Sequence, residues 1–286
     1  MRLGIHTSIA GSLEKAALKA AELGANTFQI FSTSPRMWRG SVPAVADVYR
    51  LRAARERHGL SPLVIHAGYL INLASDDPLV RSRSIAAFQG ELERAAAIGA
   101  EYLVVHPGSA KGRSREEAIA SFALGLRDAA HDFHSHSVTV LLENTAGAGD
   151  CLGARFEELQ SLRELAHGLT DLPVGFCLDT CHLLAAGFDI AGKTGLERTL
   201  REAGETLGWS HIQIFHANDS KAPRGSRVDR HAHIGEGHIG LDAFQRILRH
   251  PKLRHIPFIL ETPVTNPGDD RRNLDILKRL SARHRT

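Results

Sequence analysis

Eight short apolar segments recur along this chain, and longer segments of helical pattern separate them. Most of the short segments hold several consecutive apolar residues, which is typical of strands buried on both faces of a parallel sheet. They occupy residues 3–8, 27–33, 62–68, 101–108, 139–145, 174–182, 212–219 and 258–263. Eight strands in strict alternation with about eight helices predict an α/β fold, the (β/α)8 TIM barrel.

The segments between the strands carry signals for helix ends. Ser12 can accept a hydrogen bond as an N-cap, and Gly24 suits the left-handed position after the helix. In a later unit Asp77 can cap, Pro78 suits the first helical position and Gly99 can close the helix. These signals place each helix between two strands, as a barrel requires.

Length and composition fit one globular barrel. The chain has 286 residues, 43% hydrophobic and 23% charged, which argues against disordered and fibrous classes. Three cysteines are too few for a disulfide scaffold, and the first residues, MRLGIHTS, lack a secretory apolar region. We therefore expect residues 1–286 to form a single domain in a cytoplasmic protein that does not bind membranes. The net charge of +3 is too small to indicate nucleic-acid binding by itself.

Six consecutive strands each end in a residue that can bind a metal ion. Because successive members are 36 to 45 residues apart, about one βα unit, a barrel places them all on its C-terminal rim. A single such residue usually binds only its own loop, but six converging side chains would be costly to bury without cations. The six residues are His66, His106, Glu143, Asp179, His216 and Glu261.

Three more donors lie close to this set in the sequence. His182 follows Asp179 by three residues, and Asp229 and His231 lie in a long polar segment, 218–240, that we expect to be a functional loop. Five histidines and four carboxylates are enough for two or three ions. Imidazole mixed with carboxylate favours Zn²⁺ or Mn²⁺ over Ca²⁺.

Seven motifs that contain these donors resemble those of endonuclease IV, the zinc-dependent apurinic/apyrimidinic (AP) endonucleases of the xylose-isomerase-like barrel superfamily. The resemblance covers essentially the whole chain, and DTCH and DRH followed by IGEG are its most specific parts. The motifs read HAGYLINLAS (66–75), HPGS (106–109), LLENTAG (141–147), LDTCHLLAAGFDI (178–190), HANDSK (216–221), DRHAHIGEGHIG (229–240) and LETP (260–263).

The resemblance implies three zinc ions per chain, although Mn²⁺ or iron could replace zinc at one site. His66 and His106 would bind the first ion, with Glu143 bridging it to the second. The second ion would be completed by Asp179, His216 and Glu261, and the third would be bound by His182, Asp229 and His231.

The resemblance also implies a DNA repair activity. A metal-bound hydroxide would cut double-stranded DNA 5′ to an abasic site, and 3′-blocked ends would be cleaned at the same centre. Glu143 and Glu261 would be the catalytic carboxylates that orient the nucleophile, while Arg36, Tyr69 and Leu70 match residues that wedge the duplex open. We expect a monomer associated with the nucleoid.

Two other functions compete with this interpretation. A sugar isomerase or epimerase on the same barrel would share Glu143, Asp179, His216 and Glu261 but would leave the other donors unexplained. A non-catalytic DNA-damage binding protein would be expected to have lost some ligands, and no ligand is missing here.

Several other conspicuous residues are interpreted without a metal role. Cys177 and Cys181 are expected to be packed free thiols, and His6 and His233 are expected to lie next to the ligands, without an assigned role. Glycines at 235, 237 and 240 are expected to form a tight loop, because no strand precedes them as a dinucleotide motif requires. Basic residues in loops after the strands could face DNA phosphates but are by default solvated: Lys111, Arg113, Arg115, Lys221, Arg224, Arg227 and Arg230.

Overall fold

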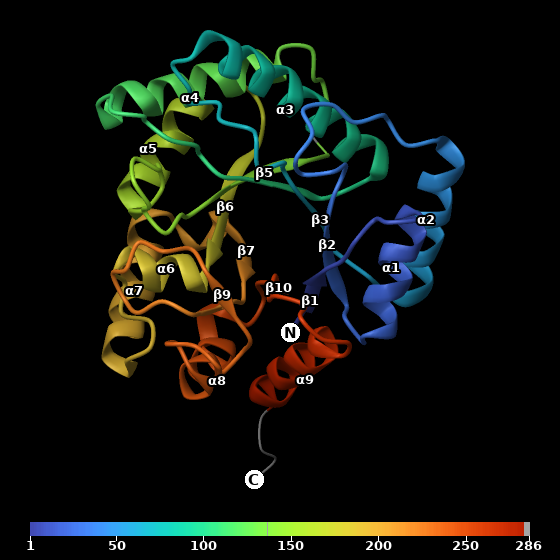
Figure 1. Cartoon of the computed structure of the whole chain (residues 1–286), viewed down its shortest axis with the longest axis vertical. Helices are drawn as coiled ribbons and strands as arrows, with labels where there is room; N and C mark the ends of the chain where they lie inside the picture. The colour runs from blue at the N-terminus through green and yellow to red at the C-terminus, as the bar shows by residue number, and fades with distance from the viewer. Residues whose placement is uncertain (136, 283–286) are drawn as a thin grey trace.

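The computed structural model describes residues 1–135 and 137–282, and these form a closed parallel barrel surrounded by helices (Figure 1). Going around the barrel, the strand order is β1-β10-β7-β6-β5-β4-β3-β2, so each strand pairs with its neighbours in sequence and the last closes on the first. Every pair in the barrel is parallel. The TIM barrel predicted from the alternating segments is confirmed.

The barrel strands are shorter than the apolar segments that predict them. After each strand-end donor the chain turns out of the sheet, so the residues that follow belong to the rim loops. The strands are β1 (Leu3–His6), β2 (Thr27–Phe31), β3 (Leu63–His66), β4 (Tyr102–Val105), β5 (Thr139–Glu143), β6 (Val174–Asp179), β7 (Ile212–His216) and β10 (Phe258–Leu260).

The helices begin and end where the sequence places their caps. Ser12 accepts a hydrogen bond from the backbone of Lys15, Asp77 accepts two at the start of α3, and Gly99 has the left-handed φ of 77°. Two helices rather than one follow β6, which raises the number above the expected eight. The described helices are α1 (Leu13–Glu22), α2 (Val45–His58), α3 (Pro78–Ile98), α4 (Arg115–Ala130), α5 (Phe156–His167), α6 (Thr180–Ala186), α7 (Lys193–Thr206), α8 (Leu241–Arg249) and α9 (Asp269–Ser281), with 3-10 turns at Trp209–His211 and Pro251–Leu253.

The segment 218–240, which we expect from the sequence to be a long functional loop, contains secondary structure of its own. Two short strands, β8 (Asp219–Ser220) and β9 (His231–Ala232), pair antiparallel within it. Ser220 lies opposite His231 in this pairing. The pairing matters because this small sheet fixes where the polar residues of the segment lie relative to the barrel.

A small apolar cluster fills the interior of the barrel, separate from the larger core between the strands and the helices. Each member comes from a different strand, and all are fully buried. We call it the inner cluster; it consists of Val64, Val104, Leu141, Cys177, Ile214 and Ile259.

None of the described helices is both long enough and apolar enough to cross a membrane.

Candidate metal centre

The strand-end donors lie directly above the inner cluster. Each donor follows its inner-cluster residue by two positions, as His66 follows Val64 and Glu143 follows Leu141. Because side chains alternate between the two faces of a strand, this spacing turns every donor toward the barrel axis. The alternation therefore places a ring of imidazoles and carboxylates directly above the inner cluster.

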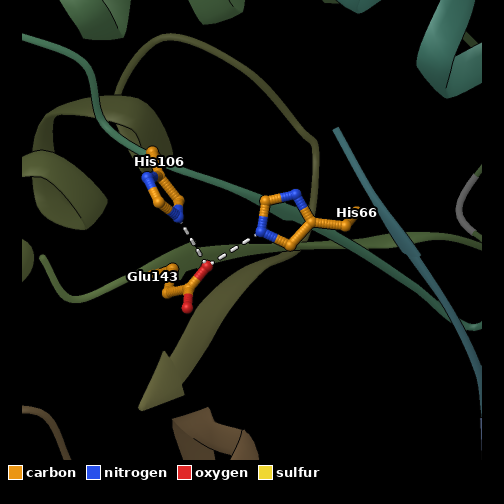
Figure 2. A group of neighbouring side chains, drawn as sticks. All are labelled: His66, His106 and Glu143. Atoms are coloured by element: carbon orange, nitrogen blue, oxygen red, sulfur yellow. Dashed lines mark hydrogen bonds and ion pairs between the residues drawn. The ribbon is translucent and has the colours of Figure 1, made fainter. Parts of the chain in front are cut away.

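Glu143 joins two histidines in the first set of donors. Its Oε2 lies 3.0 Å from His66 Nε2 and 2.9 Å from His106 Nε2. Figure 2 shows both imidazoles pointing from neighbouring strands at this one carboxylate oxygen. The geometry leaves the two nitrogens and the oxygen facing one common point.

The other oxygen of Glu143 belongs to the second set, which also holds Asp179, His216 and Glu261. His216 Nδ1 lies 2.8 Å from Glu143 Oε1 and 3.2 Å from Glu261 Oε2. Since its two oxygens face different sets, Glu143 has the arrangement of a carboxylate that bridges two ions.

The third set is built by α6 and by the segment that contains β9. The Asp179 side chain caps α6 and accepts a 2.7 Å hydrogen bond from the backbone of His182, which fixes the first turn of the helix. His182 Nε2 lies 3.2 Å from Asp229 Oδ2, and His231 Nε2 lies 3.4 Å from Asp229 Oδ1. In each set one donor atom per residue lies within 4.8 Å of the others.

Backbone carbonyls determine which histidine nitrogens face the centre. Nδ1 of His66 lies 2.8 Å from the Ala67 carbonyl, Nδ1 of His182 lies 2.9 Å from that of Asn144, and Nδ1 of His231 lies 3.1 Å from that of Glu261. A protonated Nδ1 that donates to a carbonyl leaves Nε2 free with its lone pair toward the ion site.

The charges in the centre shift the pKa values of its members in opposite directions. Burial lowers the pKa of His182, but Asp179, Asp229 and Glu143 outweigh burial and raise the pKa to about 10. Burial raises the pKa of Glu143, but His216 and His106 outweigh it and hold the pKa well below its usual value. The carboxylates thus favour the protonated form of His182, and a metal cation bound by this side chain would displace its proton.

The donors fit divalent metal ions. The Nε2 atom of His231 is buried without a hydrogen-bond partner among the described residues, although it points toward Asp229 and Asp179. A buried imidazole nitrogen in such a position is satisfied by coordination. Mixed imidazole and carboxylate ligands suit zinc and related ions.

The comparisons with known proteins identify the family of this chain. The family model described as a xylose isomerase-like TIM barrel matches residues 17–280. A curated relative from Solibacter usitatus, "Probable endonuclease 4", is 68% identical, with 98% of this chain and 97% of the relative covered. The chain belongs to the endonuclease IV family.

Other relatives support the endonuclease IV assignment. "Probable endonuclease 4" of Chloroflexus aurantiacus is 40% identical over 98% of both chains. The crystal structure of endonuclease IV from Thermus thermophilus has a TM-score of 0.87 at 40% identity, with 98% of both chains covered. A D-tagatose 3-epimerase-like protein reaches a TM-score of 0.68 at 21% identity, which shows a shared fold alone.

Gln29 and Asn218 contact residues of the candidate centre and were not identified from the sequence. Gln29 donates a 2.5 Å hydrogen bond to Glu261 and its Oε1 lies 2.9 Å from His216 Nε2. Asn218 donates at 2.6 Å to Asp179 and accepts at 2.8 Å from the Glu261 backbone. Gln29 is the polar residue in the apolar run TFQIF, and Asn218 follows His216 by two residues; these were the available signals.

His6 and His233, the two residues that the sequence places next to the ligands, differ in what they contact. His6 lies beside the centre and lines the same cavity, with Nδ1 3.7 Å from Glu261 and 3.0 Å from Gln29 Nε2. His233 instead contacts α9, where Asn273 and Asp269 lie beside its ring. Only His6 therefore reaches a ligand candidate.

Both thiols near the centre are buried. Burial raises the pKa of Cys177 and of Cys181 to about 12, so each stays a neutral thiol at physiological pH. Cys177 packs in the inner cluster, although its sulfur also lies near Glu143 and His216. This environment agrees with the interpretation of packed free thiols.

Of the three predicted wedge residues, only Tyr69 lines the cavity of about 280 Å³ at the mouth of the barrel. Tyr69, 65% exposed, lines the cavity together with His66, His106, His182 and others. Its ring packs edge-on against Phe31, with centroids 5.3 Å apart. Arg36 is exposed and Leu70 half-buried. Burial raises the pKa of the Tyr69 hydroxyl, and the Arg36 charge opposes this rise.

Three of the basic loop residues singled out in the sequence donate hydrogen bonds to backbone carbonyls of this chain. Arg113 donates to the Ala74 carbonyl, Arg115 to the Cys151 carbonyl at 2.7 Å, and Arg224 to the Gly187 carbonyl at 2.8 Å. These three guanidinium groups connect rim loops to one another, which differs from the solvated state expected from the sequence.

Proposed function

We propose that this chain hydrolyses the phosphodiester bond 5′ to abasic sites in double-stranded DNA. The observation that carries the proposal is the convergence of nine donor side chains, in three sets, on the rim of a barrel of the endonuclease IV family. Polar residues that serve only to close loops would not share carboxylates between sets as Glu143 does.

The three sets would hold three zinc ions, with Mn²⁺ or iron as a substitute at one of them. His66, His106 and Glu143 would bind the first, Glu143, Asp179, His216 and Glu261 the second, and His182, Asp229 and His231 the third. When bound, the ions would neutralise the phosphate, lower the pKa of a water and stabilise the departing 3′ oxygen.

The two catalytic carboxylates would act as positioning acceptors. Glu143 is fully buried and held by three imidazoles, so its oxygens cannot turn away from the centre. Glu261 is held by Gln29 on one side and lines the cavity on the other, where it can accept a hydrogen bond from the attacking water. Cleavage would leave a 3′-hydroxyl and a 5′ deoxyribose phosphate.

Arg36, Tyr69 and Leu70 would contact the DNA. Tyr69 lines the cavity, and its loop is joined to the loop of Arg36 by a 2.9 Å hydrogen bond from the Tyr69 amide to the Pro35 carbonyl. An aromatic and an aliphatic side chain at this place can fill the gap in a base stack at which a base is missing, because unstacking costs least there.

The same centre would remove phosphate and sugar fragments from 3′-blocked ends, since these substrates present the same phosphate ester bond. We further propose that residues 1–286 act as one endonuclease domain, that the protein is a monomer, and that it works in the cytoplasm on nucleoid DNA.

The test is cleavage of an oligonucleotide duplex that carries one abasic site, with and without a chelator, together with metal analysis of the purified protein. We expect a single cut 5′ to the lesion, lost on chelation and restored by Zn²⁺, and about three ions per chain. An otherwise identical duplex without the lesion is the control.

Two results would refute the proposal. Turnover of a small sugar, one ion per chain and an intact abasic duplex would indicate an isomerase on the same barrel. Tight binding of the abasic duplex without any cleavage in the zinc-loaded protein would indicate a damage-binding protein.

A further inference from the structure

The carboxylate of Asp219 is buried in β8 and surrounded by backbone amides. Its Oδ1 accepts hydrogen bonds from Ser220 and Ile239, both at 2.8 Å. Its Oδ2 accepts three more, from Gly235 at 2.9 Å and from Gly237 and Gly240 at 3.2 Å. Five amides directed at one carboxylate form an anion nest, which stabilises a negative charge without a cationic side chain.

The glycines of this nest are required by its shape. A Cβ at Gly237 would overlap the Ser220 carbonyl and Asp219 Oδ1, so only glycine lets the amide approach the carboxylate. Gly235 and Gly240 have φ values of 86° and 80°, in the region that favours glycine. The tight loop predicted from these glycines is therefore wrapped around an internal anion.

The nest holds the C-terminal end of the segment that carries Asp229 and His231 against β8. Asp219 and Ser220 pair with Ala232 and His231 across the small sheet, and the His238 amide donates to the Ser220 carbonyl at 2.8 Å. Asp229 and His231 therefore lie on a segment anchored by β8 on one side and by the nest on the other. Asp229 itself is half-exposed, and few other contacts hold it.

We propose that Asp219 is a positioning residue that holds Asp229 and His231 in place for the third metal ion. The inference rests on the proposed function in so far as that function needs a third ion. Asp219 touches neither the ion site nor the cavity, so it acts through the fold of residues 229–240.

Asp219→Asn tests the proposal because it preserves size and removes the charge. Whichever way the new amide turns, its NH₂ group must face at least two of the five backbone N–H donors, so the nest opens. The control is Glu236→Gln, which removes one charge from the same loop but affects only an exposed ion pair with Arg272.

The measurements are zinc content of the full-length protein after dialysis, hydrogen exchange and steady-state kinetics on the abasic duplex. Asp219→Asn should retain about two ions per chain, whereas Glu236→Gln should retain about three. Amides of residues 231–240 should exchange at least tenfold faster in Asp219→Asn, and kcat should fall while KM stays within about twofold.

A second variant protects the test against simple misfolding. Gly237→Ala leaves Asp219 intact but displaces its carboxylate, so it should cause the same selective loss of one ion. Loss of all ions together, or a far-UV circular dichroism spectrum unlike that of the wild type, in both variants would indicate a purely structural role and overturn the proposal. Full zinc retention with normal exchange would also overturn it.

The outcome is separable from that of the proposed function. If the wild type binds three ions but leaves the abasic duplex intact, the endonuclease proposal fails while the role of Asp219 is still measured by zinc content. If the wild type binds only two ions, the third site itself is refuted.

Discussion

At the residue scale, Gln29 decides how His216 faces the centre. Three histidines of the centre, His66, His182 and His231, place Nδ1 on a backbone carbonyl and turn Nε2 toward the centre. His216 has the opposite orientation, with Nδ1 toward Glu143 and Glu261. Its Nε2 meets the Gln29 carbonyl oxygen instead, which requires the proton on Nε2. The Gln29 amide thus selects the tautomer of His216 through its oxygen and orients Glu261 through its nitrogen.

We expect Gln29→Ala to weaken zinc binding at the second set by about tenfold to a hundredfold, because outer-shell partners tune metal affinity by that amount. Competition with a chromophoric chelator measures this affinity. Gln213→Ala is the matched control, since Gln213 lies near the start of β7 and accepts a hydrogen bond from Tyr102. Equal zinc affinity in Gln29→Ala and wild type would refute the role of Gln29.

Glu143→Gln should abolish cleavage of the abasic duplex while DNA binding stays nearly intact. The substitution keeps the side-chain volume but replaces one of two acceptor oxygens, each of which faces different donors. Cleavage is measured in single-turnover assays and binding by electrophoretic mobility shift. Glu164→Gln, on the surface of α5, serves as control. Residual cleavage above about one part in a thousand would contradict the bridging role.

At the element scale, two rim loops form one unit beside the cavity. A buried ion pair between Glu91 and Arg94 of α3 binds Ser32, and Arg94 also donates to the Gly40 carbonyl at 3.4 Å. The loop between Ser32 and Gly40 is thereby held at both ends. It carries Arg36 and, through Pro35, meets the Tyr69 amide.

We expect Tyr69→Ala to raise KM for the abasic duplex by about tenfold to a hundredfold, which corresponds to the loss of one stacking contact. The value of kcat and the zinc content should change little, because Tyr69 touches the centre only by its ring edge. Tyr49→Ala removes an equally exposed tyrosine from α2 and should leave KM unchanged. A fall in kcat with unchanged KM would show that Tyr69 is not a wedge.

Strand-end donors could be predicted from the sequence because each depends only on its own segment. His66 and Glu143 end apolar runs, and the barrel periodicity brings such ends together. Gln29, Asn218 and Asp219 could not be assigned in this way, because their partners lie far along the chain or are backbone amides. The small β8–β9 sheet could not be predicted either, because strands of only two residues leave no recognisable pattern in the sequence.

At the scale of the whole molecule, the fold of the barrel does not depend on an occupied metal centre. Most of the buried apolar surface lies between strands and helices or in the inner cluster, and neither needs an ion. The donors, by contrast, are buried charged groups: burial and the Glu143 charge raise the pKa of Glu261, and His216 and His6 outweigh both and lower it. A metal ion would offset the cost of burying these carboxylates.

Removal of the metal by a chelator should therefore leave the far-UV circular dichroism spectrum unchanged but lower the Tm by roughly 5–10 °C, as expected when ligands bind only the folded state. Zn²⁺ should restore the Tm, and Mg²⁺ serves as the control because it prefers oxygen ligands. Unfolding at room temperature on chelation would show that the ions hold the barrel together.

The inner cluster has a consequence for the order of events during turnover. Its six side chains are fully buried and close the barrel beneath the donor ring, so in the described part of the chain the cavity opens at the mouth. A duplex docked there would cover the route by which solvent arrives. If bound DNA seals this cavity, the water consumed in each hydrolysis would have to be in place before the DNA binds, and water would return to the centre only after the cut strand has dissociated.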